Sequence, residues 1–84
     1  METVVRYSQD EIEDILNALA DENIYGTILR AKGIVASHEG QWIHFDYVPG
    51  SPDVRNGGAD VIGRLCVIGS GINKEAIAKL FRVG

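Results

Sequence analysis

Three side chains with donor atoms suited to transition metals fall within predicted strands of this 84-residue chain: His44, Asp46 and Cys66. His44 and Asp46 are two residues apart, so they share one face of an extended segment. Imidazole, carboxylate and thiolate groups are ligands that zinc or cobalt accepts. A structural zinc site needs four ligands, and the chain has neither a CxxC nor an HxxxH pattern. A stand-alone metal-binding domain is therefore only the alternative hypothesis.

Basic side chains recur on the same predicted face of the sheet. Arg30 and Lys32 alternate with apolar residues or glycine between Leu29 and Val35. Because side chains alternate between the two faces of a strand, one face there suits a core and the other carries positive charge. Three basic residues and one aromatic anchor are the predicted partner contacts: Arg30, Lys32, Trp42 and Arg64. The alternative is a solvated outer face whose cations pair with Asp46 across the strands.

Signals for catalysis are weak. A single cysteine within an apolar strand, such as Cys66, is more often a small apolar filler than a nucleophile activated by His44. Glycines at positions 69 and 71 precede a helix, but the chain has neither a GxxxxGK[ST] nor a GxGxxG motif. We therefore expect no enzymatic activity from these residues.

Composition restricts the setting and the partners of the chain. The formal net charge of −4 at pH 7 and the single outward aromatic ring argue against a nucleic-acid surface. One cysteine cannot form an intrachain disulfide, and no apolar run approaches the roughly 20 residues of a membrane span. The first residues lack the features of a signal peptide. We expect a cytoplasmic protein that binds neither nucleic acid nor membrane, and the sequence leaves its oligomeric state open.

The spacing of apolar residues predicts elements in the order β-α-β-β-β-α. Ser8 and Glu11 form a capping box for a helix that ends near Glu22, and Asn73 caps a final helix. Strands are predicted over residues 3–7, 27–37, 41–48 and 63–68, with a long polar loop over 49–62.

These elements predict a single α+β domain over residues 1–84. Its architecture would be a two-layer sandwich, in which a four-stranded mixed sheet carries two helices on one face. The inward side chains of the third strand would be Ile43, Phe45 and Tyr47, because these apolar residues alternate with Trp42, His44 and Asp46.

Two strand motifs resemble the C-terminal domain of the CobW family. Residues 30–33 read Arg-Ala-Lys-Gly, where family members typically carry R-x-K-G. Residues 64–69 read Arg-Leu-Cys-Val-Ile-Gly, which is similar to the family's R-L-V-x-I-G with Cys66 in place of an aliphatic residue. The runs over 7–33 and 71–75 are also similar, so the resemblance spans nearly the whole chain.

The resemblance implies a role beside a GTPase. CobW-like proteins are P-loop GTPases that deliver metals such as zinc or cobalt to client proteins. This chain resembles their C-terminal domain alone, so no cofactor is expected in it, and GTP, magnesium and GTP hydrolysis would belong to a missing N-terminal domain. The implied function is a non-catalytic module that contacts a CobW-like GTPase domain or a metalloprotein client during metal delivery and cobalamin-related metal insertion. Arg30, Lys32 and Arg64 would be contact residues.

Overall fold

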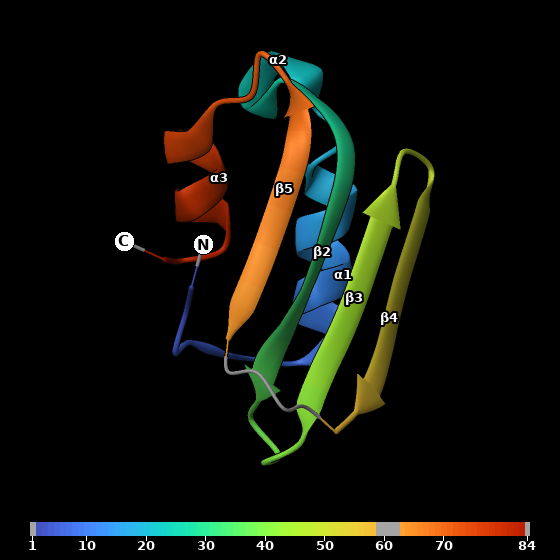
Figure 1. Cartoon of the computed structure of the whole chain (residues 1–84), viewed down its shortest axis with the longest axis vertical. Coiled ribbons are helices and arrows are strands. Elements are labelled where there is room, and N and C mark those ends of the chain that lie inside the picture. The colour runs from blue at the N-terminus through green and yellow to red at the C-terminus, as the bar shows by residue number, and fades with distance from the viewer. Residues whose placement is uncertain (1, 59–62, 84) are drawn as a thin grey trace.

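The computed structural model describes residues 2–58 and 63–83, and its longest strand lies at the centre of the sheet. The elements in chain order are β1 (Arg6–Tyr7), α1 (Gln9–Ala18), α2 (Glu22–Tyr25), β2 (Thr27–Ser37), β3 (Trp42–Val48), β4 (Ser51–Gly57), β5 (Arg64–Ser70) and α3 (Lys74–Leu80). Together they form an α+β fold with a mixed sheet (Figure 1). The predicted α+β class and mixed sheet are confirmed, but the sheet has five strands rather than the predicted four, and the predicted order lacks β4 and α2. The two-layer sandwich stays a prediction.

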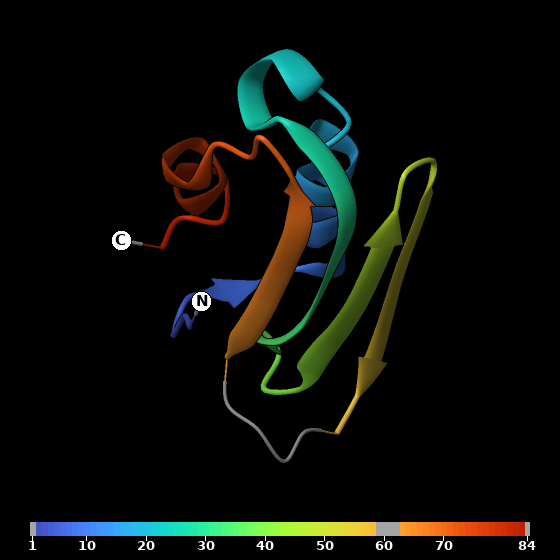
Figure 2. The same cartoon turned by 45° about the horizontal axis from the view of Figure 1, so that its top comes forward.

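Strand β2 is paired along both of its edges. On one edge it pairs antiparallel with β3, from Ala31 opposite Tyr47 to Ala36 opposite Trp42. On the other edge it pairs antiparallel with β5, and its last two residues pair in parallel with β1. β4 extends the sheet beyond β3. Helix α1 lies behind the sheet and α3 lies on the far side of β5 from β4, as Figures 1 and 2 show.

The segment predicted as a long loop contains strand β4. The two-residue turn Pro49-Gly50 joins it to β3, and Gly50 has a φ of 80°, which a glycine adopts without strain. The loop prediction is therefore wrong over residues 51–57, and residues 59–62 lie outside the described part. Pro52 and Gly57 disfavoured the prediction of a strand here, because both residue types are uncommon within strands. An edge strand tolerates Pro52 because only one of its sides needs backbone donors.

The first helix is shorter than predicted. Its capping box is confirmed, since the Glu11 N–H donates to Ser8 Oγ at 3.1 Å and the Ser8 N–H donates to Glu11 Oε1 at 2.9 Å. The helix ends at Ala18 rather than near Glu22, because the Asp21 side chain accepts the backbone N–H of Asn23 and caps the separate helix α2. Within the described residues, no helix is long and apolar enough to cross a membrane.

A bulge changes the faces of the first residues in β2. The pairing with β5 shifts between Ile28 and Arg30, so Leu29 is an extra residue. Leu29 is 55% exposed while Ile28 is 3% exposed, and the prediction that Leu29 faces the core is wrong. The predicted alternation holds from Arg30 onward, with Ala31 buried and Lys32 exposed.

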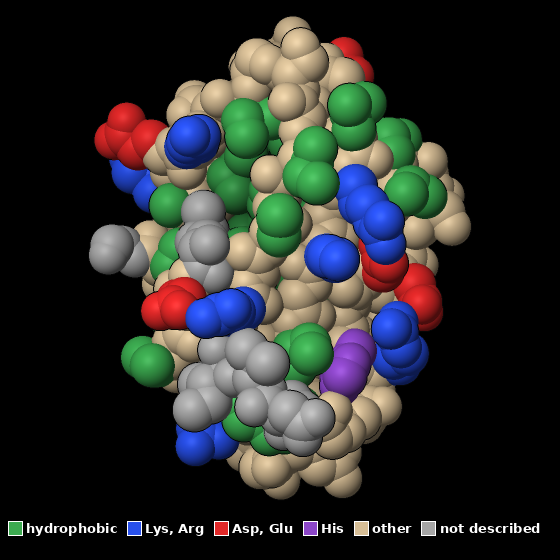
Figure 3. Space-filling view, viewed as in Figure 1, with side chains coloured by type: hydrophobic (Ala, Val, Ile, Leu, Met, Phe, Trp, Pro, Cys, Tyr) green, Lys and Arg blue, Asp and Glu red, His purple; other side chains and the backbone are tan. Residues whose placement is uncertain are grey.

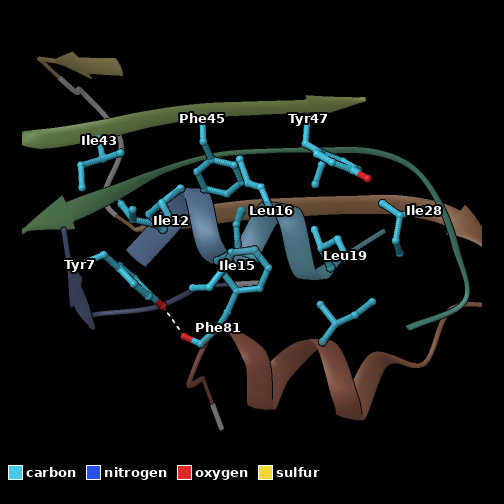
Figure 4. Close-up of a cluster of buried hydrophobic side chains, with 14 residues drawn as sticks. Tyr7, Ile12, Ile15, Leu16, Leu19, Ile28, Ile43, Phe45, Tyr47 and Phe81 are labelled. Carbon is cyan, nitrogen blue, oxygen red and sulfur yellow. Dashed lines mark hydrogen bonds between the residues drawn. The ribbon is translucent and has the colours of Figure 1, made fainter. Parts of the chain in front are cut away.

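The core lies between the inner face of the sheet, α1 and α3 (Figure 4). The predicted inward residues Ile43, Phe45 and Tyr47 are confirmed as buried. The rings of Phe45 and Phe81 stack with their centroids 5.9 Å apart. The buried Tyr7 hydroxyl donates to the backbone carbonyl of Phe81. These contacts fix the end of α3 against strands that lie far from it in sequence.

Gly33 makes room for the side chains that cover β2. It lies opposite both Phe45 and Leu65 on the core face. A Cβ atom at this position would lie 2.8 Å from Phe45 Cε2, 2.8 Å from Leu65 Cβ and 2.7 Å from the Arg64 carbonyl oxygen. These distances are below van der Waals contact, so the strand needs a residue without a side chain here.

The Gly33→Ala substitution is expected to lower the free energy of unfolding by about 1–3 kcal/mol, the usual cost of overpacking a core. Urea unfolding followed by tryptophan fluorescence measures the change. Gly58→Ala is the matched control, since a Cβ there meets no atom within 4 Å. Equal stability of the two variants would contradict the packing role of Gly33.

Glu11 joins three separate parts of the chain. Its carboxylate accepts the Ser8 N–H, lies 3.0 Å from His38 Nε2 and lies 2.9 Å from an Arg82 guanidinium nitrogen. The Arg82 guanidinium carbon is also 5.0 Å from the centroid of the Tyr7 ring. The hydrogen bond from the Ser8 backbone, and then that from His38, hold the pKa of Glu11 below its ordinary value of 4.5.

This lowered pKa sets the pH dependence of the Glu11 contribution. Ionised Glu11 contributes stability above pH 4.5, and the contribution is lost as the pH falls through the folded-state pKa. We expect Glu11→Gln to lower the midpoint of urea unfolding at pH 7 and to lose this difference from the parent on acidification. Glu13→Gln, exposed on the same helix, is the control. A difference that stays constant over the whole pH range would rule out the charge as its cause.

Candidate interaction surface

The face of the sheet opposite α1 carries rows of side chains set by strand register, and two of these rows lie at its centre; we call it the open face. Directly opposed residues share a face, so each row crosses the sheet from β5 to β4. The first row is Cys66, Lys32, Asp46 and Asp53. The second row is Arg64, Ile34, His44 and Arg55. The open face therefore collects the outward residues predicted for three strands and adds two charged residues from β4.

A shallow groove of about 690 Å³ runs over the open face. Its basic lining residues are Lys32, Arg55 and Arg64, and its acidic ones are Glu2 and Asp46. Figure 3 shows groups of both signs across this face. The face is thus mixed in charge rather than uniformly basic.

Most cations of the open face already have carboxylate partners. Arg30 donates two hydrogen bonds to Asp46, from Nε to Oδ1 at 3.3 Å and from Nη2 to Oδ2 at 2.9 Å. This hydrogen bonding is the largest cause of a lowered pKa for Asp46 and a raised pKa for Arg30. An Arg55 nitrogen lies 2.8 Å from Asp53, and Arg64 Nε lies 3.5 Å from Glu2. The hypothesis that Asp46 neutralises part of this face therefore holds for Arg30.

Lys32 is the cation of the open face that is available to a partner. It is exposed and lies between Asp46 on β3 and Cys66 on β5 in the register. It forms no ion pair with any residue that the structure describes. A partner's carboxylate could bind Lys32 directly, whereas binding to Arg30 would compete with Asp46.

Exposed apolar side chains surround Arg30 at one end of the open face. Leu29 is 55% exposed and Ile68, which lies opposite Arg30, is 52% exposed. Continuation of the β2–β3 register places Val48, also exposed, on the other side of Arg30. The exposure of Leu29 follows from the bulge, which the residue pattern does not show. The exposure of Ile68 could have been predicted, because Ile68 lies two residues after Cys66 and so shares its face. We call Leu29, Val48 and Ile68 the apolar patch.

The residues of the metal hypothesis share the open face without converging on one point. Lys32 separates Asp46 from Cys66 in the register, so these two lie two strand spacings apart, about 9–10 Å. His44 Nε2 lies 2.6 Å from the Gly58 carbonyl oxygen, and Asp46 is engaged by Arg30. Within residues 2–58 and 63–83, no three His, Cys, Asp or Glu side chains form a group that could hold a metal ion. The arrangement does not place these three ligands on one metal.

Trp42 lies away from the cations with which it was grouped. It is half-buried and pairs with Ala36 and Gly57 at the start of β3. Lys32 lies opposite Asp46, four residues further along β3, which corresponds to about 13 Å. An aromatic anchor at Trp42 would therefore serve a different part of the open face from Lys32.

The two motifs of the family resemblance lie side by side on paired strands. Lys32 is opposite Cys66, and Gly33 is opposite Leu65. The motifs therefore place their basic residues on the open face and Ala31 and Leu65 in the core, whereas Ile68 of the second motif is exposed. The Cys66 side chain is exposed, so the interpretation of this cysteine as an apolar filler is wrong.

A comparison with family models identifies the family of this chain. The model described as cobalamin synthesis protein cobW C-terminal domain matches residues 4–83. The chain therefore belongs to this family, and the resemblance drawn from the two motifs is confirmed. Comparisons with curated proteins and with solved structures found no match.

The exposure of Cys66 can be tested by thiol labelling. We expect iodoacetamide to modify Cys66 in the folded protein at a rate comparable to that in urea, because the side chain lies on the open face. Mass spectrometry over a time course measures both rates. Strong protection of the folded protein in its monomeric state would contradict the assigned face.

Proposed function

We propose that this domain is a non-catalytic interaction module of the CobW type, which uses its open face to bind a CobW-like GTPase domain or a metalloprotein client. The family match supports the class of protein. The observation that carries the proposed surface is the apolar patch beside Lys32 on a sheet face that no described helix covers. The two features together favour a protein partner.

The composition of the surface suits a protein interface. Exposed apolar side chains in a group gain about 25 cal/mol per Å² when a partner removes them from water. Leu29 and Ile68 each expose more than half of their surface, so they have area to bury. Charged groups around an apolar centre orient the partner and select it more than they increase affinity.

Lys32 supplies the directional contact in this proposal. A partner's carboxylate at the groove could pair with it while Arg30 keeps its hydrogen bonds to Asp46. The preferred partner surface is then apolar with an acidic side chain at its rim. The predicted contact residues Arg30 and Arg64 would act through their existing pairs, as a frame around Lys32.

The chemical steps of metal delivery lie elsewhere under this proposal. GTP, magnesium and the transported zinc or cobalt would be held by the GTPase half and the client. The domain would supply binding energy and orientation, and so couple nucleotide state to client recognition. Its part in cobalamin-related metal insertion would be to hold the complex together.

The open face is tested by two substitutions that leave the core unchanged. Lys32→Glu reverses the available charge and Ile68→Asp places a charge in the apolar patch. We expect each to weaken binding to a CobW-like GTPase domain by about tenfold or more, because the loss of a central contact commonly costs this much. Calorimetric titration with the GTPase domain in its GTP-analogue and GDP forms measures the change, followed by the same titration with a metalloprotein client.

Lys74→Glu is the matched control for charge reversal. Lys74 is exposed at the start of α3, away from the open face, and an acidic residue is tolerated in a first helical turn. Circular dichroism should show the same fold for all three variants. Unchanged affinity of both open-face variants for the GTPase domain and for the client would reject the proposed surface.

A further inference from the structure

Strand β4 ends the sheet with a free edge. It pairs with β3 on one side, and none of the described strands pairs with its other side. All seven of its residues are exposed or, at Val54, half-buried. An edge of this kind presents unpaired backbone groups to any extended segment that can lie beside it.

The positions of the unpaired groups follow from the hairpin. Val48 and Ser51 close the two-residue turn, so Tyr47 and Pro52 form the next pair, which exchanges no hydrogen bonds. Pro52 has no N–H, which is consistent with a position that faces away from β3. Every second residue repeats this direction, so Val54 and Asn56 also point their N–H and C=O groups to the free edge.

The charges beside Val54 are self-complementary. Asp53 and Arg55 flank it, lie on the open face opposite Asp46 and His44, and approach each other to 2.8 Å. If two copies of β4 pair antiparallel with Val54 opposite Val54, Asp53 of each copy lies opposite the partner's Arg55. A register shifted by two residues sets Asp53 against Asp53 or Arg55 against Arg55, which is unfavourable. The charge pattern thus selects one register.

We propose that β4 pairs with β4 of a second copy of this chain, with a twofold axis at Val54. The two Val54 residues would exchange both backbone hydrogen bonds, and each Asn56 N–H would donate to the partner's Pro52 carbonyl. The two sheets would become one continuous sheet. Because a single strand forms the contact, the dimer is a weak and reversible one. This inference is independent of the function proposed for the open face.

Charge exchange between Asp53 and Arg55 tests the register. Asp53→Arg makes both positions basic and Arg55→Asp makes both acidic, so each variant alone opposes like charges. An equimolar mixture restores opposite charges at both positions. We expect the association constant of each variant to fall by about tenfold or more, and the mixture to associate at least as well as the parent chain. Sedimentation equilibrium at physiological salt, over concentrations up to the millimolar range, measures all four samples.

Each outcome decides the proposal. A parent chain that stays monomeric throughout the series overturns it, and so does a dimer whose association is unaffected by both substitutions. A mixture that associates no better than its components overturns the register. Lys32→Glu, on the open face but remote from the β4 edge, should dimerise like the parent chain. If either variant is unfolded by circular dichroism, Asp53→Lys and Arg55→Glu provide the equivalent pair.

Discussion

Pairing of β2 along both of its edges determines how the other strands are arranged. This strand pairs with β1, β3 and β5, which are distant from one another in sequence, and so it aligns all three. Gly33 makes the alignment compatible with a packed core, because it leaves space for Phe45 and Leu65 to lie over the strand. The register fixed there decides which side chains reach the core and which reach the open face.

The same register explains why the open face has a limited positive character. Each of the three arginines lies near a carboxylate: Arg30 near Asp46 on the neighbouring strand, Arg55 near Asp53 in the next row of its own strand, and Arg64 near Glu2 in the N-terminal segment. Lys32 forms no ion pair with a described residue, because Arg30 engages its neighbour Asp46 and its other neighbour is Cys66, although the Lys32 charge also contributes to the lowered pKa of Asp46. The surface is therefore better described as an apolar patch with one directed cation than as a basic sheet.

Much of the fold could be predicted from local patterns, and the failures have identifiable physical causes. The Ser8–Glu11 capping box and the alternation of Ile43, Phe45 and Tyr47 are signals contained within a few residues. Strand β4 was not predicted because its stability comes from pairing with β3 rather than from its own composition. The candidate site was predicted in part: Lys32 and Arg64 lie on the open face as expected. The exposure of Leu29 on the open face could not be predicted, because it results from a bulge that period-2 alternation does not show.

The hydrogen bond from Tyr7 to the Phe81 carbonyl brings segments near both ends of the described chain together. Figures 1 and 2 show both ends on the β5 side of the molecule, away from β4. A neighbouring domain linked through either end would start from the same corner and would leave the β4 edge unobstructed. Linker length, more than the order of the two domains, would then set the effective concentration of that neighbour at the sheet.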